Sequence, residues 1–126
     1  MPLSLDFNRS PHAIVIRVDA VESVQELSVA YGEMLRQAEF DTSRNSVWDI
    51  SPISLGAFSI SEVREFARLV RGKISARGEG FKVALVTSRA TDRQLLKLYL
   101  AILRMIGNNL HYRVFASLDE AIVWAG

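Results

Sequence analysis

The sequence predicts an α/β fold in which an N-terminal β-hairpin is followed by βαβαβα-type crossovers. The expected architecture is a single open mixed sheet of about five strands with about four helices. Two observations predict it: short apolar segments alternate with segments of helical periodicity, and four helix starts carry capping sequences. The chain has 126 residues, of which 49% are hydrophobic, so residues 1–126 should form one domain around a buried core.

The five strands are expected from periodicity of two and from β-branched content. Leu3, Leu5 and Phe7 alternate with polar residues, which indicates a strand with one wet face. The turn-forming segment 8–11 and the β-branched run 13–18 complete an antiparallel hairpin. Short apolar segments predict the other three strands at 47–50, 81–86 and 112–115.

Each helix is expected to begin at a capping box, in which an N-cap oxygen and a later Glu or Gln satisfy free backbone amides. The four boxes pair Asp19 with Glu22, Ser59 with Glu62, Thr91 with Gln94, and Ser117 with Glu120. The first two helices have ordinary amphipathic patterns.

The third helix, which follows Thr91, has apolar residues over about half of its circumference, more than one sheet face normally covers. Leu100 falls between Lys97 and Arg104 on the polar edge of this helix. We therefore expect part of the helix to meet a second surface.

Composition and charge argue against several classes of function. A net charge of +1 gives no electrostatic case for a nucleic-acid or anionic-membrane partner. No segment has the roughly 20 apolar residues of a membrane-spanning helix, and the first residues lack the features of a signal peptide, so a cytoplasmic location is expected. The chain has no cysteine, and its two histidines, His12 and His111, lack metal-ligand spacing, so neither a metal nor another cofactor is expected.

The order of elements, the segment Val47-Trp48-Asp49-Ile50 and the C-terminal segment 114–124 resemble the SpoIIAA-like branch of the STAS domain family, which is discussed beside the SEC14-like lipid carriers. The resemblance implies a non-enzymatic regulatory module of bacterial signalling. In STAS antagonists a strand ends in Asp, and a downstream Asp-Ser-Ser-Gly stretch carries a serine that a partner kinase phosphorylates. Asp49 and Ser59 match the acid and the serine by spacing. The flanking residues depart from that stretch at Ala57, Phe58 and Ile60.

Two sets of residues are candidates for binding. The polar set follows strands or opens helices, at the sheet edge where open α/β folds receive ligands: Asp49, Ser51, Ser59, Ser61 and Thr87. Capping and turn formation are the alternative roles for this set. The apolar set belongs to the segment 51–58 and to the third helix: Ile53, Leu55, Phe58, Tyr99, Leu100 and Leu103. It either packs on its own core or forms a lid or partner surface.

Catalysis is not expected, because Asp49 has no evident acid–base partner and neither Ser51 nor Ser59 lies in a Gly-x-Ser-x-Gly elbow. Arg89 and Arg93 flank the start of the third helix and are further candidates for holding an acidic ligand. Two functions remain. The first is a STAS-like interaction module that binds a regulatory protein or its own copy as a homodimer. The second is a carrier or sensor of a small apolar ligand or lipid, suggested by the broad apolar arc of the third helix.

Overall fold

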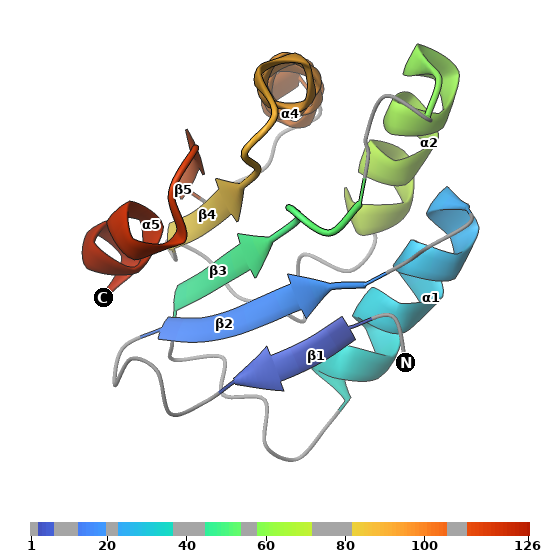
Figure 1. The fold of residues 1–126 in the computed structure, drawn as a ribbon. Coiled ribbons are helices and arrows are strands. Elements are labelled where there is room, and N and C mark those ends of the chain that lie inside the picture. Colours follow the sequence, from blue (N-terminus) through green and yellow to red (C-terminus); the bar gives the residue numbers. More distant parts are fainter. Residues whose placement is uncertain are drawn as a thin grey trace.

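A computed structural model describes residues 3–6, 13–19, 23–36, 45–53, 58–71, 82–105 and 111–126. Within these ranges the chain has five strands and four helices (Figure 1). In chain order they are β1 (Leu3–Asp6), β2 (Ala13–Val18), α1 (Val24–Leu35), β3 (Asn45–Asp49), α2 (Ile60–Arg71), β4 (Lys82–Val86), α4 (Ala90–Met105), β5 (His111–Phe115) and α5 (Leu118–Ala125). The predicted α/β class, with a hairpin and crossovers, is confirmed.

The strands form one mixed sheet in the order β1-β2-β3-β4-β5. β1 pairs antiparallel with β2, placing Leu5 opposite Ile16, and all other neighbours are parallel. Because β2 to β5 run in the same direction, their carboxyl ends all lie at the same edge of the sheet. This carboxyl edge is where side chains from β3 and β4 meet.

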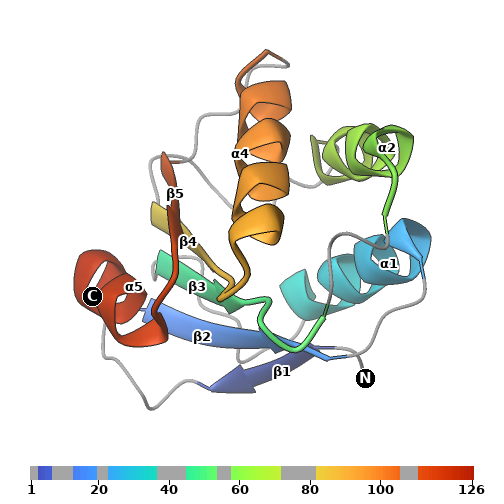
Figure 2. The same cartoon turned by 45° about the horizontal axis from the view of Figure 1, so that its top comes forward.

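Three helices, α1, α2 and α4, contribute to a core cluster on one face of the sheet, and α5 packs on the other face (Figure 2). Right-handed crossovers that advance in one direction place all their helices on the same side. Each crossover moves by one strand, about 4.8 Å, whereas packed helices need about 8–10 Å each. The middle helix, α2, therefore packs mainly against α1 and α4, with few contacts to strands.

The two faces of the sheet have different side chains. The three-helix face of the sheet carries large residues, including Ile14 and Ile16 of β2, and Leu103 of α4 packs in the same cluster; all three are almost completely buried. The α5 face is built from small or β-branched residues of the sheet, which allow α5 to approach closely: Ala13, Val15, Val47, Ala84 and Val86. Phe115 and Trp124 contact each other at the β5 side of this smaller cluster, with ring centroids 5.6 Å apart and ring planes tilted by 50°.

Two predicted helix starts are confirmed. At α2, the Ser59 amide donates to Glu62 Oε1 at 3.1 Å and the Glu62 amide donates to Ser59 Oγ at 3.2 Å. This is a reciprocal capping box. At α5, Ser117 is the N-cap and accepts a hydrogen bond from the Glu120 amide.

The other two predicted starts are wrong. Asp19 is not the N-cap of α1; its carboxylate accepts hydrogen bonds from Ser4 Oγ at 3.1 Å and Arg17 Nε at 3.3 Å. α1 begins later, with Ser23 as its N-cap. Thr91 lies inside the first turn of α4, which begins at Ala90.

The prediction for the polar edge of α4 is also wrong. Leu100 is buried with Leu96 and Leu103 in the three-helix cluster. The large apolar residues of α4 that are exposed are Leu98 and Met105, and the exposed fraction of Met105 is 86%. The apolar arc of α4 is thus wider than its buried side, but the exposed part lies elsewhere than expected.

Candidate functional site

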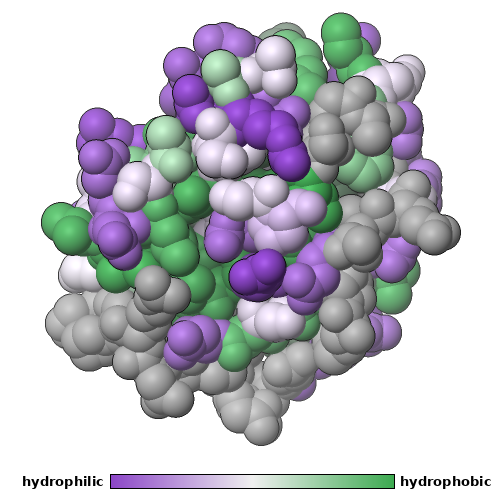
Figure 3. All heavy atoms as spheres, in the orientation of Figure 1, coloured by the Kyte–Doolittle hydropathy of each residue, from purple (hydrophilic) through white to green (hydrophobic). Residues whose placement is uncertain are grey.

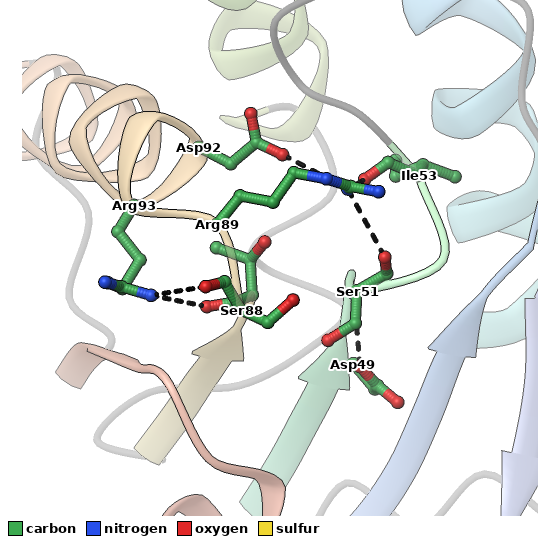
Figure 4. Close-up of polar contacts among 8 residues, drawn as sticks. Asp49, Ser51, Ile53, Ser88, Arg89, Asp92 and Arg93 are labelled. Atoms are coloured by element: carbon green, nitrogen blue, oxygen red, sulfur yellow. Dashed lines mark hydrogen bonds and ion pairs between the residues drawn. The ribbon is translucent and has the colours of Figure 1, made fainter.

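The candidate site is the carboxyl edge of the sheet, where β3 and β4 end. In Figure 3, polar atoms gather in the middle of this side of the molecule, and apolar atoms lie beside them toward α5. The close-up in Figure 4 shows the segment after β3 facing the start of α4 across this edge. The sequence-predicted residues Asp49, Ser51 and Ile53 lie on one side, and Thr87 follows β4 on the other.

Asp49 stabilises the turn that follows β3. Its Oδ1 accepts a hydrogen bond from the Ser51 amide at 3.1 Å. The next residue, Ile50, donates its amide to Val86 O at 2.8 Å, and the Ile53 amide donates to Ile50 O at 3.1 Å. An aspartate that binds the amide two residues ahead is a common turn device, so the alternative considered for Asp49, turn formation, is the role that its contacts support.

Arg89 joins the segment after β3 to α4. Its Nη1 donates to Ile53 O at 2.7 Å and to Ser51 O at 3.4 Å, and lies 3.5 Å from Asp92 Oδ2 (Figure 4). The Asp92 side chain is 1% exposed. A buried carboxylate requires a charged or hydrogen-bonding partner, and Arg89 is one such partner. The guanidinium thus links the loop and the first turn of α4.

Arg93 contacts the chain immediately after β4. Its Nη1 donates to Ser88 O at 2.9 Å and to Thr87 O at 3.2 Å. Sequence reasoning considered Arg89 and Arg93 as holders of an acidic ligand, whereas these contacts are with backbone carbonyls of the chain itself. The three-residue spacing of Arg89 and Asp92 was the available signal for the first contact.

Thr87 lies at the end of β4 and is completely buried. Its backbone is fully engaged, because the amide donates to Phe115 O at 3.1 Å and the carbonyl accepts from Arg93. The side-chain hydroxyl oxygen, Oγ1, has no hydrogen-bond partner among the residues that the structure describes. A buried hydroxyl without a partner is costly, which makes Thr87 the least satisfied polar residue of the edge.

A second group of predicted residues lies at the start of α2. Ser59 is the N-cap, Ser61 is exposed in the first turn, and Phe58 is half-buried. Ile60, between the two serines, has an exposed fraction of 53%. Leu55 lies outside the described residues. The sequence named the serines and Phe58 as binding candidates and Ile60 only as a departure from the STAS stretch, whereas Ile60 presents apolar surface at this point.

The predicted apolar residues of α4 face the interior. Leu100 and Leu103 are buried in the three-helix cluster, which also contains Ile53. Tyr99 packs against Phe66 of α2, with ring centroids 5.7 Å apart. Burial raises the pKa of the Tyr99 phenol well above its usual value, and the nearby phenols of Tyr112 and Tyr31 raise it further. Tyr99 is therefore a neutral side chain at physiological pH, which suits packing rather than proton transfer.

Neither a metal site nor a membrane span is evident in the described ranges. They contain no group of three or more His, Asp or Glu side chains arranged to hold a metal ion. None of the helices in this part of the chain is long and apolar enough to cross a bilayer.

Comparisons with known proteins identify no relative. No protein-family model matches the chain, and neither a curated protein nor a solved structure matches it. The function must therefore be argued from the residues and their contacts.

Proposed function

We propose that this chain is a non-catalytic, STAS-like binding module that docks a regulatory protein partner in the bacterial cytoplasm. The observation that carries the proposal is the exposed Ile60 at the start of α2. The polar side chains of that edge contact their own backbone: Asp49 binds the turn, Arg89 binds the loop, and Arg93 binds the end of β4. Polar groups used in this way hold a surface in a fixed shape, which favours recognition of a partner.

The proposed docking surface consists of Phe58, Ser59, Ile60 and Ser61, and we call it the α2-start surface. It combines a half-buried aromatic ring and an exposed aliphatic side chain with two serine hydroxyls. Apolar anchors surrounded by polar groups are typical of the energetic centre of protein interfaces. Fully burying an isoleucine side chain contributes about 1.5–3 kcal/mol, enough for Ile60 to act as one such anchor.

Phosphorylation of Ser59 is a further proposal that the STAS-like resemblance suggests, but docking does not depend on it. The Ser59 hydroxyl already accepts from the Glu62 amide, and the Glu62 carboxylate binds the Ser59 amide. A phosphate on Ser59 would gain from the helix N-terminus but would face the Glu62 carboxylate. Phosphorylation would therefore exchange the capping box for a different local arrangement, and mass spectrometry of protein purified from its native cells tests for it.

The docking proposal is tested by isolating the partner and measuring its binding to purified variants. Tagged protein is purified from its native cells, the captured protein is produced separately, and binding is measured by calorimetry. Ile60→Asp should weaken binding at least tenfold. The matched control is Val123→Asp, which adds the same charge at a residue of α5 that is 82% exposed. Equal effects of the two substitutions, or no binding by any purified candidate, would refute the proposal.

The alternative, a carrier of a small apolar ligand or lipid, has weaker support from these contacts. Two of its candidate residues, Leu100 and Leu103, pack against other core side chains of the chain. Native mass spectrometry after gentle extraction distinguishes the two functions. A bound lipid at stoichiometric occupancy would favour the carrier, whereas bare protein that binds its partner would favour the docking module.

A further inference from the structure

The outward side of α4 carries apolar residues with positive charges along one flank. Leu98, Ala101 and Met105 are exposed, and successive members are three and four residues apart, so they lie on one side of the helix. Lys97 and Arg104 are exposed and follow the same flank of that stripe, seven residues apart. We call these five residues the α4 outer face. Its charged residues are all basic.

The outward side of α1 has the opposite charge on its flank. Val29 is 61% exposed. Glu26 and Glu33 are exposed and share one flank beside Val29, again seven residues apart. We call Glu26, Val29 and Glu33 the α1 outer face. Arg36, also exposed, comes after it, at the C-cap of α1.

The two outer faces match in spacing as well as in charge. Seven residues of α-helix span about 10.5 Å, so two acidic side chains on one helix can face two basic side chains on another. Val29 lies near the midpoint of Glu26 and Glu33, and Ala101 near the midpoint of Lys97 and Arg104. A small alanine opposite a valine lets the helix axes come close. The match holds for helices that run parallel. At about 100° per residue Lys97 and Arg104 lie about 50° to one side of Ala101, and Glu26 and Glu33 about 50° to the other side of Val29, so only a parallel pair brings the two charged flanks together.

We propose that the α4 outer face of one copy of this chain binds the α1 outer face of a second copy. Charge decides between the possible helix pairs. Pairing α4 with α4 would place Lys97 and Arg104 near like charges, and pairing α1 with α1 would do the same for Glu26 and Glu33. Only the unlike pair brings opposite charges together while covering Met105, Leu98 and Val29.

The contact joins different surfaces of the two copies. If it forms reciprocally about a two-fold axis, the product is a closed dimer; if it forms once per pair, each copy retains one unused outer face and association continues to a ring or an open chain. The contact differs from the proposed docking of a regulator, since it uses none of the four residues of the α2-start surface. Loss of one binding activity can therefore be observed without loss of the other.

Charge reversal tests the proposal in purified full-length protein. The first variant, Lys97→Glu with Arg104→Glu, has two acidic outer faces, and the second, Glu26→Lys with Glu33→Lys, has two basic ones. We expect each variant alone to self-associate at least tenfold more weakly than the unaltered chain in sedimentation velocity, over concentrations reaching about 1 mM because small interfaces are weak. An equimolar mixture should regain association, since each acidic face then meets a basic one.

Two controls make the result specific. Arg64→Glu with Arg68→Glu changes the net charge by the same amount as the first variant, on exposed residues of α2, and should leave association unchanged. Because the chain has no cysteine, Val29→Cys and Ala101→Cys variants can be mixed in equal amounts and joined with a short thiol cross-linker, and heterodimers should exceed either homodimer by far more than the twofold ratio that random encounters give. A chain that stays monomeric throughout the series, a mixture that does not regain association, or cross-links with no heterodimer excess beyond that ratio would overturn the proposal.

Discussion

Thr87 is a completely buried polar residue at the candidate site. Its hydroxyl oxygen has no hydrogen-bond partner among the described residues, although the side chain is completely buried. Val83 and Leu85, which precede it by even steps along β4, belong to the three-helix cluster. By the alternation of a strand, Thr87 continues toward the same side, close to the first turn of α4. An apolar side chain of equal size should suit this position.

We therefore predict that Thr87→Val raises the free energy of unfolding by up to about 1 kcal/mol, because it removes an unpaired buried hydroxyl without leaving a cavity. Urea denaturation followed by circular dichroism measures the change. Thr87→Ser is the control: it keeps the hydroxyl, loses a methyl group, and should lower stability by about 1 kcal/mol. A destabilised valine variant would show that the hydroxyl has a bound partner, such as a buried water.

Tyr99 gives the chain a pH dependence in the alkaline range. Burial, and then the phenols of Tyr112 and Tyr31, raise its pKa in the folded chain. The unfolded chain releases this proton near pH 10, whereas the folded chain retains it. Stability from this group is therefore complete below about pH 10 and falls as the pH rises above it. Tyr99→Phe should flatten the fall, as seen by comparing urea midpoints of the two proteins from pH 8 to above 10.

A titration of the tyrosines can contradict the buried position of Tyr99. Spectrophotometric titration at 295 nm follows all three tyrosines of the chain. In the unaltered folded protein, we expect the Tyr99 phenol to ionise only at the alkaline pH at which the protein unfolds. The Tyr99→Phe variant should therefore lack the phenol that ionises at the highest pH. If the variant instead loses a phenol that titrates near pH 10 in the native state, Tyr99 is accessible to solvent and the interpretation of α4 as a packed helix fails.

Among single residues, the sequence was informative where the pattern was local. Asp49 was correctly placed at the end of a strand and Ser51 after it, and Ser59 was correctly identified as a cap. The partners of Arg89 could not be found in the same way, because Ile53 O lies 36 residues away along the chain. A contact of that kind depends on how the segment after β3 meets α4, which no local pattern encodes.

In the helices too, some features follow from the local sequence and others from contacts with distant residues. Ser23 competes with Asp19 for the start of α1, and both have suitable side chains. The outcome depends on Ser4 and Arg17, which hold the Asp19 carboxylate at the end of β2. Leu100 of α4 is a similar case. On a regular helix it lies about 40° from both Leu96 and Arg104, so its burial depends on how the helix is rotated over its neighbours.

The caps should contribute measurably to stability. We predict that Ser23→Ala and Ser59→Ala each lower the free energy of unfolding by about 1 kcal/mol, because each removes an acceptor for a first-turn amide. Thr91→Ala is the matched comparison, since Thr91 lies within the first turn of α4, and should change stability by less than about 0.5 kcal/mol. Equal losses at Thr91 and Ser23 would mean that the observed helix starts are misplaced.

For the whole molecule, the sheet order has a consequence for the helix layer. Strands β2 to β5 advance in one direction, so the three crossover helices must share one face. Their combined width exceeds what single-strand steps provide, and α2 lies outside, between α1 and α4 (Figures 1 and 2). The sequence predicted the number and order of these elements. It could not predict which helix is displaced, because all three have a buried stripe.

This arrangement predicts that α2 opens more readily than the other helices. Its attachment depends on helix neighbours, including the contact of Phe66 with Tyr99, whereas α5 packs directly on four strands, β2 to β5. Hydrogen exchange followed by mass spectrometry should show faster exchange in α2 than in α5. An aromatic pair contributes about 0.5–1.5 kcal/mol beyond its buried area, so Phe66→Ala should speed exchange in α2 roughly tenfold or more while leaving α5 unchanged. Equal acceleration in both helices would indicate that exchange occurs through global unfolding. In that case α2, including the α2-start surface, would open only together with the rest of the molecule.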